Sequence, residues 1–206
     1  MLSVIGAAML ALALVCTSHP VSAQSAETKA VETLQDGLLA IMANPPVGGS
    51  TARSAALGKL VADTFDINAM GEVAVGARTF RSWNAFQRET FIDAFARFMV
   101  ATHASRFVGT TGQSFEIEGS EEAPSGRMIV HSRYLQSENP AVPIDYLVQP
   151  TNDGWRILDV YLDETISLLA LHRSEFSSVL RDRGFDGFIA AMHAKVDELA
   201  SRPDGS

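Results

Sequence analysis

The stretch from Trp155 to Leu199 constrains the fold of this chain more than any other segment. Residues 155–162 read as a strand that runs directly into two amphipathic helical segments. The apolar positions of the strand change from one face to the other after Ile157, as they do at a β-bulge. Both faces of the predicted sheet are therefore expected to be covered. The stretch contains no catalytic motif, so it favours a protein with an apolar interior over one with a reaction centre.

Two helices are predicted after this strand. From Ile166 onwards apolar residues recur at helical spacing as far as Gly184, which can adopt the positive φ that often ends a helix. A second helix follows at once, and its apolar stripe runs from Phe185 to Leu199. A glycine at such a junction can also act as a hinge. Ending a helix is the more frequent role, and the sequence leaves both readings open.

Residues 1–23 have the features of a cleavable signal peptide. Met1 to Ala13 is an uncharged apolar run, and Val21-Ser22-Ala23 supplies small residues at the positions that signal peptidase reads. The basic residue that usually precedes the apolar run is missing. A lipoprotein anchor at Cys16 is less favoured, because the residues before it do not match the pattern of a lipid-modified cysteine. We therefore expect a mature chain of residues 24–206 in the periplasm.

The composition of the mature chain excludes several classes of function. Residues 1–23 contain no charged side chain, so the mature protein keeps the formal net charge of −8 and has no cysteine. Nucleic acid is an unsuitable partner for such an acidic chain. The length fits a single domain, and no repeat or long linker interrupts residues 24–206. The histidines show no metal-ligand spacing, so neither a metal nor another cofactor is predicted.

The order of the predicted elements indicates an α+β fold. Three amphipathic helices come first, around residues 31–42, 57–65 and 85–109, and Asn84 with Gln87 forms a capping box at the start of the third. The apolar period then changes to two around residues 115–117, 128–130 and 144–148. Helices, then a meander of strands, then helices are typical of a curved antiparallel sheet packed against helices.

Five short motifs occur in a characteristic order within residues 28–199. They are Phe65-Asp66 with Met70; Gln87-Arg88 with Phe91, Ala94 and Phe95; Trp155-Arg156-Ile157 with Asp159-Val160; Arg173 with Phe176; and Gly184-Phe185-Asp186-Gly187-Phe188-Ile189. In order and spacing they resemble the MlaC, or toluene-tolerance, family of periplasmic phospholipid-binding proteins. The resemblance implies an NTF2-like fold around an apolar cavity. It also implies a carrier that exchanges lipid between an inner-membrane ABC transporter complex and an outer-membrane complex, with only transient membrane contact and no enzymatic activity.

Two segments depart from the family pattern. Glu164-Thr165 and Leu171-His172 stand where the family commonly has Gly-Val and Asn-Tyr, and residues 76–83 are longer than the corresponding family motif. These departures resemble the HpnM branch, which is associated with hopanoid biosynthesis. Both a phospholipid and a hopanoid require a dry cavity, so the sequence does not decide which of the two is the ligand.

The resemblance and the strand alternation together give a set of candidate lipid-binding residues. They are Phe95, Met99, Met128, Val130, Ile144, Tyr146, Val148, Leu158 and Val160. Any one of them, taken alone, is more often a core residue than a cavity residue. Four arginines, Arg78, Arg81, Arg88 and Arg106, could form a phosphate-binding rim. The favoured reading for exposed helical arginines is that they are solvated.

Two other classes of function compete with a lipid carrier. NTF2-like folds also include isomerases that use a carboxylate in an apolar pocket, and Asp145 and Asp159 lie on predicted strands. Alternation with Ile144 and Tyr146 predicts that Asp145 faces outwards, whereas the predicted bulge leaves Asp159 unplaced. The third class is a structural adaptor with a filled core and no open cavity.

Overall fold

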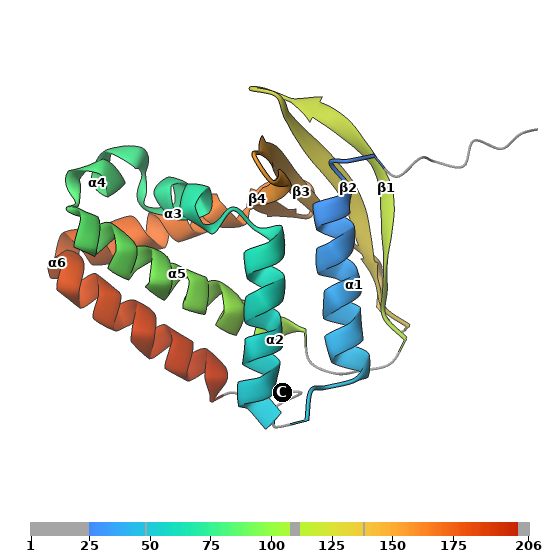
Figure 1. The fold of residues 1–206 in the computed structure, drawn as a ribbon, viewed down its shortest axis with the longest axis horizontal. Coiled ribbons are helices and arrows are strands. Elements are labelled where there is room, and N and C mark those ends of the chain that lie inside the picture. The colour runs from blue at the N-terminus through green and yellow to red at the C-terminus, as the bar shows by residue number, and fades with distance from the viewer. Residues whose placement is uncertain (1–24, 48, 108–111, 138, 202–206) are drawn as a thin grey trace, which may run out of the picture.

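The structure is a computed structural model that describes residues 25–47, 49–107, 112–137 and 139–201. The predicted signal peptide lies outside the described residues. Within these residues five helices precede a five-stranded antiparallel sheet, and a long kinked helix follows it (Figure 1). The α+β prediction is confirmed. The elements are α1 (Lys29–Ala43), α2 (Gly49–Thr64), α3 (Ile67–Val75), α4 (Ala77–Ser82), α5 (Ala85–Arg106), β1 (Ser114–Ala123), β2 (Arg127–Leu135), β3 (Val142–Thr151), β4 (Gly154–Leu162), β5 (Ile166–Ser167) and α6 (Leu168–Ala200).

The sheet is a meander in which each strand pairs with the next along the chain. In the β3–β4 pair the register shifts so that Val148 lies opposite Ile157 and Leu147 lies opposite Asp159. Leu158 is therefore the extra residue of a β-bulge, as the change of apolar face in the sequence predicted. Ile157, Leu158, Asp159 and Val160 are consequently all buried.

Helices α1 and α2 run side by side, and α1 lies against the sheet (Figure 1). A buried polar link joins α1 to the strands. Gln35 Nε2 donates to Ser132 Oγ at 3.0 Å, and Ser132 Oγ donates to the carbonyl oxygen of Ile144 at 2.6 Å. Buried hydroxyl and amide groups need such partners, so this chain of bonds fixes the position of α1 over β2 and β3.

The short helices α3 and α4 were not predicted from the sequence. Asp66 places the first of them: its backbone N–H donates to the carbonyl oxygen of Ile157, and its carboxylate accepts from the N–H of Ala69 at 3.0 Å. The second carboxylate oxygen accepts from Gln149 Nε2 at 2.8 Å. Asp66 therefore caps α3 and attaches it to both β3 and β4.

Helix α5 begins with the predicted capping box, in which Asn84 and Gln87 bond reciprocally. An aromatic cluster surrounds the first half of this helix. Its neighbouring ring centroids lie 5.0–6.4 Å apart, and its members are Phe80, Trp83, Phe91, Phe95, Phe98, Phe176, Phe185 and Phe188. The centre of the helical half of the molecule is therefore filled by rings.

Helix α6 has two arms that meet at Gly184, whose φ of 67° and ψ of −174° are non-helical. The positive φ at Gly184 was predicted, but the ψ places the residue outside the ordinary left-handed helical region. The predicted start at Ile166 is wrong by two residues: Ile166 and Ser167 form β5, and Ser167 caps the helix by accepting from the N–H of Ala170. The two arms contact each other through Phe176 and Phe188.

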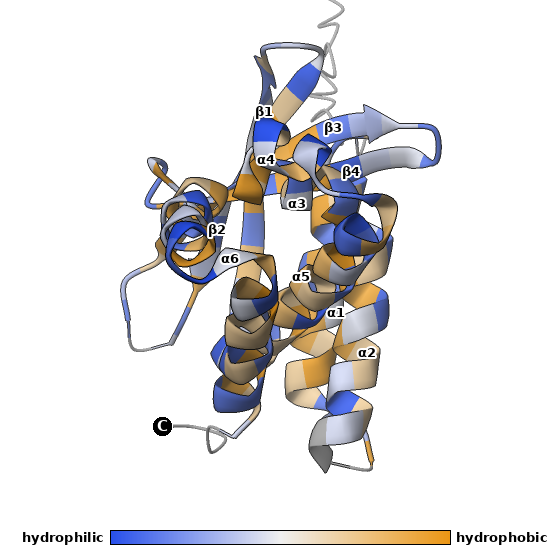
Figure 2. Ribbon diagram, turned by 90° about the vertical axis from the view of Figure 1, so that its left-hand side faces the viewer, coloured by the Kyte–Doolittle hydropathy of each residue, from blue (hydrophilic) through white to orange (hydrophobic). Residues whose placement is uncertain are grey.

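Hydrophobic positions concentrate where the helices meet one another and the sheet, and the hairpin tips are mainly hydrophilic (Figure 2). Within the described part of the chain, no helix has the length and hydropathy needed to cross a bilayer.

Candidate functional site

An apolar cavity of about 190 Å³ lies between the sheet, α1, α5 and the start of α6. Its walls come from elements far apart in the sequence. The antiparallel sheet and the hydrogen bonds of Asp159 to the start of α6 bring them together. The apolar and aromatic lining consists of Leu34, Leu38, Met70, Met99, Phe107, Tyr134, Ile144, Tyr146, Val160, Leu162, Leu168 and Leu169. We call this space the inner cavity.

A second, larger space of about 540 Å³ lies between α5 and the two arms of α6. We call it the outer groove. Apolar side chains make most of its surface, and polar ones are added from the ends of the helices. Its lining includes Phe98, Ser105, Glu175, Phe176, Val179, Phe188, Ala191, Met192, Lys195 and Leu199.

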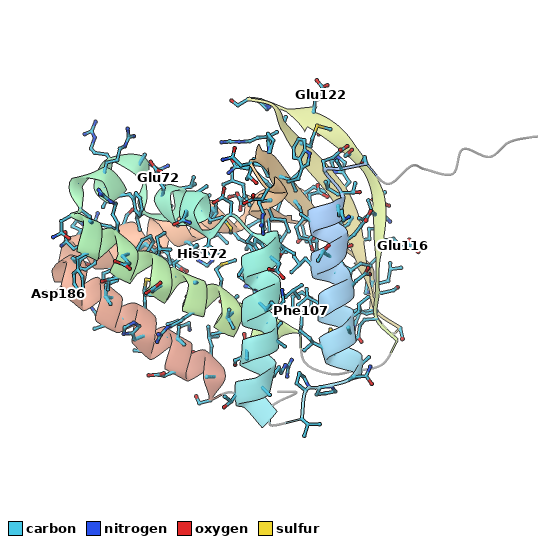
Figure 3. The ribbon with its side chains drawn as sticks, in the orientation of Figure 1. Glu72, Phe107, Glu116, Glu122, His172 and Asp186 are labelled. Carbon is cyan, nitrogen blue, oxygen red and sulfur yellow. The ribbon has the colours of Figure 1, made fainter. Side chains whose placement is uncertain are left out.

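Three residues line both spaces: Thr102 and Arg106 on α5, and His172 on the first arm of α6. His172 on α6 packs against Phe98 on α5, whereas Glu116 and Glu122 point away from the sheet (Figure 3). The inner cavity and the outer groove are therefore neighbours separated by a wall of polar side chains. A ligand pocket usually has about 300–1,000 Å³, so the inner cavity alone is small and the outer groove falls within that range.

The candidate residues from the sequence divide into two groups. Met99, Ile144, Tyr146 and Val160 line the inner cavity. Phe95, Met128, Val130, Val148 and Leu158 line neither space among the described residues. The contact of any of these residues with lipid stays a prediction.

The second group is used for packing. Phe95, Val130 and Val148 are completely buried, and Phe95 lies between the rings of Phe91, Phe98 and Phe176. A large residue at Val130 or Val148 would therefore strain the core and leave the inner cavity open. Substitutions meant to fill the cavity belong at the first group.

Sequence reasoning missed the α1 side of the inner cavity and its polar members. Leu34 and Leu38 belong to an amphipathic stripe that was recognised only as helical. Thr102 and His172 interrupt apolar stripes, and a polar residue inside such a stripe is the signal that could have identified them.

Asp159 lines the inner cavity and is almost completely buried. Burial raises the pKa of its carboxyl, and hydrogen bonds oppose that rise. One oxygen accepts from the N–H groups of Val160 at 2.8 Å and Leu169 at 3.1 Å, and the other accepts from Ser167 Oγ at 2.5 Å. The carboxylate therefore joins the bulged part of β4 to the first turn of α6.

The two histidines of the inner cavity have lowered pKa values. Burial is the main cause for both, and the positive charge of Arg106 lowers both pKa values further. His103 Nδ1 donates to the carbonyl oxygen of Met99 at 2.8 Å. His172 stacks on Phe176 with a centroid distance of 5.5 Å and an interplanar angle of 11°. Both rings are therefore neutral at pH 7.

Asp145 lies outside both spaces, so the structure does not bring it together with Asp159. Its carboxylate is 3.1 Å from His131 Nδ1, and His131 also lies 3.7 Å from Glu121. The alternation that predicted an outward direction gave no warning of its burial, since Asp145 is only 6% exposed. Its neighbours are polar groups of the sheet and not cavity residues.

Of the four candidate rim arginines, only Arg106 lines the cavity and the groove. Arg81 lies 3.9 Å from Glu72, and Arg88 donates to the carbonyl oxygen of Trp83 at 2.8 Å. Arg78 is exposed. The side chains that the structure describes contain no group of three or more that could hold a metal ion.

Comparison with known proteins bears on this arrangement. The sequence profile described as MlaC protein matches residues 32–194, which is most of the chain. This chain belongs to the MlaC family. No curated protein sequence shows significant similarity to it. Among solved structures, the phospholipid-binding protein from Ralstonia solanacearum, in complex with a phospholipid, has the same fold: the TM-score is 0.74 with 19% sequence identity over 85% of this chain and 99% of that protein. The matched region of this MlaC-family chain contains every lining residue of the inner cavity and all of those of the outer groove except Lys195 and Leu199.

Proposed function

We propose that this MlaC-family protein is a periplasmic lipid carrier that binds the apolar part of a lipid in the inner cavity. The observation that carries the proposal is an apolar cavity walled by α1, α5, α6 and the sheet that adjoins a larger groove at Thr102, Arg106 and His172. The phospholipid bound to the structural relative supports the same ligand class. The expected signal peptide, residues 1–23, supports the location.

Physical chemistry explains the need for such a carrier. Burial of a methylene group stabilises by about 0.8 kcal/mol, so exposing a chain of roughly fourteen methylenes to water costs about 11 kcal/mol. Unassisted transfer of a lipid across an aqueous gap is correspondingly slow. A protein cavity removes most of that cost. The net charge of −8 also limits non-specific adhesion to anionic membranes, which suits a shuttle.

The exchange partners proposed for the carrier are an inner-membrane ABC transporter complex and an outer-membrane complex. This part of the proposal rests on the membership of the MlaC family. The ligand is a phospholipid or, if the chain belongs to the HpnM branch, a hopanoid. Glu164-Thr165 and Leu171-His172 are the residues that favour this branch.

Asp159 is the one observation that favours an enzyme, because a buried carboxyl with a raised pKa in an apolar cavity can act as a general base. Its three hydrogen bonds, to Val160, Leu169 and Ser167, already give it a structural role. We therefore propose binding without catalysis. An Asp159→Asn variant is expected to keep its lipid content.

Native mass spectrometry of the protein purified from its own cell envelope tests the proposal. The wild type is expected to carry lipid, and Val160→Trp, which fills the inner cavity, is expected to lose it while the protein still folds. Val160→Ala is the matched control, since it enlarges the cavity and should keep lipid. A wild-type protein that is free of lipid, together with turnover of a small substrate that Asp159→Asn abolishes, would replace the carrier with an enzyme.

A further inference from the structure

One stripe of α5 continues from the aromatic core into the wall between the two spaces. Phe98, Thr102 and Arg106 follow one another at intervals of four residues, so their side chains lie on the same face of the helix. All three line the outer groove. His172 packs edge-on against Phe98 with a centroid distance of 5.1 Å. The Thr102 and His172 side chains therefore border the same part of the wall.

Two polar atoms in this wall are buried without a hydrogen bond to any described part of the protein: Thr102 Oγ1 and His172 Nδ1. A carboxylate oxygen of Glu175 lies 3.7 Å from His172 Nδ1, which is too far for a hydrogen bond. Buried polar atoms in folded proteins are nearly always hydrogen-bonded. Two unpaired ones at the boundary between two apolar spaces indicate a partner that comes from outside the protein.

We infer that Thr102 and His172 form a polar subsite that binds a neutral oxygen of the lipid, an ester carbonyl or a hydroxyl, where the ligand passes from the inner cavity into the outer groove. The hydroxyl of Thr102 and the N–H of a neutral imidazole can both donate to one carbonyl oxygen. This inference rests on the proposed function, because it requires a ligand that spans both spaces.

The chemistry of the wall favours a neutral oxygen over a phosphate. His172 is neutral, since burial lowers its pKa by more than the Glu175 carboxylate raises it. A phosphate placed at this depth would lose its hydration without gaining a full positive partner. Arg106 is exposed and borders the groove, so a charged headgroup can meet it nearer to water.

Paired ligands that differ only in the oxygen atoms offered to the subsite test it. Vesicles of phosphatidylglycerol with ester-linked chains are compared with vesicles of the ether-linked analogue, which lacks both carbonyl oxygens, and bound lipid is counted by native mass spectrometry. The wild type is expected to prefer the ester roughly five- to tenfold, as one or two net hydrogen bonds give. A second pair, a pentacyclic triterpene alcohol and its parent hydrocarbon, distinguishes a hydroxyl source from an ester source.

Substitutions locate the effect. Thr102→Val and His172→Phe keep the shape of the wall and are expected to abolish the preference while both lipids of a pair still bind. Thr102→Val should also raise the unfolding midpoint of the lipid-free protein, because it removes an unpaired buried hydroxyl. Thr64→Val is the matched control. Its hydroxyl donates to the carbonyl oxygen of Leu60 at 2.7 Å, so its loss should lower the midpoint and leave the preference intact.

The outcomes separate the inference from the proposed function. If the wild type binds both members of each pair equally, the subsite is wrong and the lipid cavity stands. A preference that survives in both Thr102→Val and His172→Phe also overturns the subsite. If no lipid of either pair binds to the wild type, the proposed function fails, and the inference fails with it.

Discussion

The two halves of α5 have similar apolar patterns and different surroundings. In the first half, Phe91 and Phe95 are completely buried among other aromatic rings. In the second half, Met99 and Thr102 border the inner cavity. Gly71 on α3 explains part of the difference: a Cβ there would lie 2.7 Å from Ile92 Cδ1 and 3.1 Å from a ring carbon of Phe91. Close approach of α3 fills the space at one end of α5 only.

This difference shows that an apolar stripe specifies burial without specifying what the stripe is buried against. The first half of α5 contacts rings that fill its surroundings, which gives stability. The second half also packs, with His103 against Phe65 and Phe107, but it borders the inner cavity and the outer groove, which leave room for a ligand. Stability and binding should therefore respond to substitutions in opposite halves of one helix.

The largest effect is expected from truncating a side chain in the first half of α5, where aromatic rings fill the surroundings. Phe91→Ala removes a ring that contacts Phe80, Trp83, Phe95 and Phe188, so the free energy of unfolding should fall by about 3–5 kcal/mol. Met99→Ala should cost less, because its side chain already borders a cavity. Urea unfolding of the two lipid-free variants measures both values. Equal losses would remove the distinction between the halves.

A smaller effect is expected where α3 approaches the first half of α5 at Gly71. Gly71→Ala introduces a methyl group against Ile92 and Phe91 and should lower the free energy of unfolding by about 1–3 kcal/mol. Gly58→Ala on α2 is the matched control. Its new Cβ would meet only Val100, at 3.9 Å, so better helix propensity should stabilise the protein by up to about 1 kcal/mol. Thermal unfolding of both variants gives the two signs, and stabilisation by Gly71→Ala would contradict the close approach.

The kink at Gly184 sets the angle between the two arms of α6, which form the outer groove beside the second half of α5. Its φ of 67° with ψ of −174° lies in a region that only glycine adopts readily, so Gly184→Ala should cost about 1–3 kcal/mol although no atom would meet the new Cβ. If Gly184 is also a hinge, the rate of lipid transfer to acceptor membranes should change by more than lipid affinity does. Proportional changes in rate and affinity would leave Gly184 with a structural role alone.

The features that sequence predicted correctly have local causes. The capping box at Asn84, the bulge at Leu158 and the positive φ at Gly184 each follow from a few neighbouring residues. Helices α3 and α4 were missed because both are short, and α3 is fixed by Asp66, whose partners lie on distant strands. The placement of Phe95 in the core and of Met99 at the cavity could not be predicted, because it depends on how closely α3 and α6 approach each part of α5.

The smallest effect concerns pH. It again distinguishes the two halves of α5, because the histidines with shifted pKa values, His103 and His172, lie at the second half, beside the inner cavity. The pKa values of His103 and His172 lie below the ordinary value of 6.5 in the folded protein. The unfolded chain therefore takes up protons first as pH falls below about 6.5, and stability should decrease by at most about 1.4 kcal/mol per pH unit for each histidine until the folded pKa is passed.

Asp159 acts in the opposite direction, because its raised pKa gives a contribution that is present below the unfolded value of 3.8 and is lost as pH rises through the folded pKa. Denaturation midpoints measured between pH 7 and 5 should thus fall with decreasing pH through the histidine effect, and any contribution from Asp159 has the opposite sign. His103→Phe should flatten the profile over this range, although loss of its bond to Met99 lowers stability at pH 7. An unchanged slope of stability against pH in His103→Phe would mean that the second half of α5 does not hold this ring in its neutral form. The contrast between the two halves of α5 would then be one of packing alone.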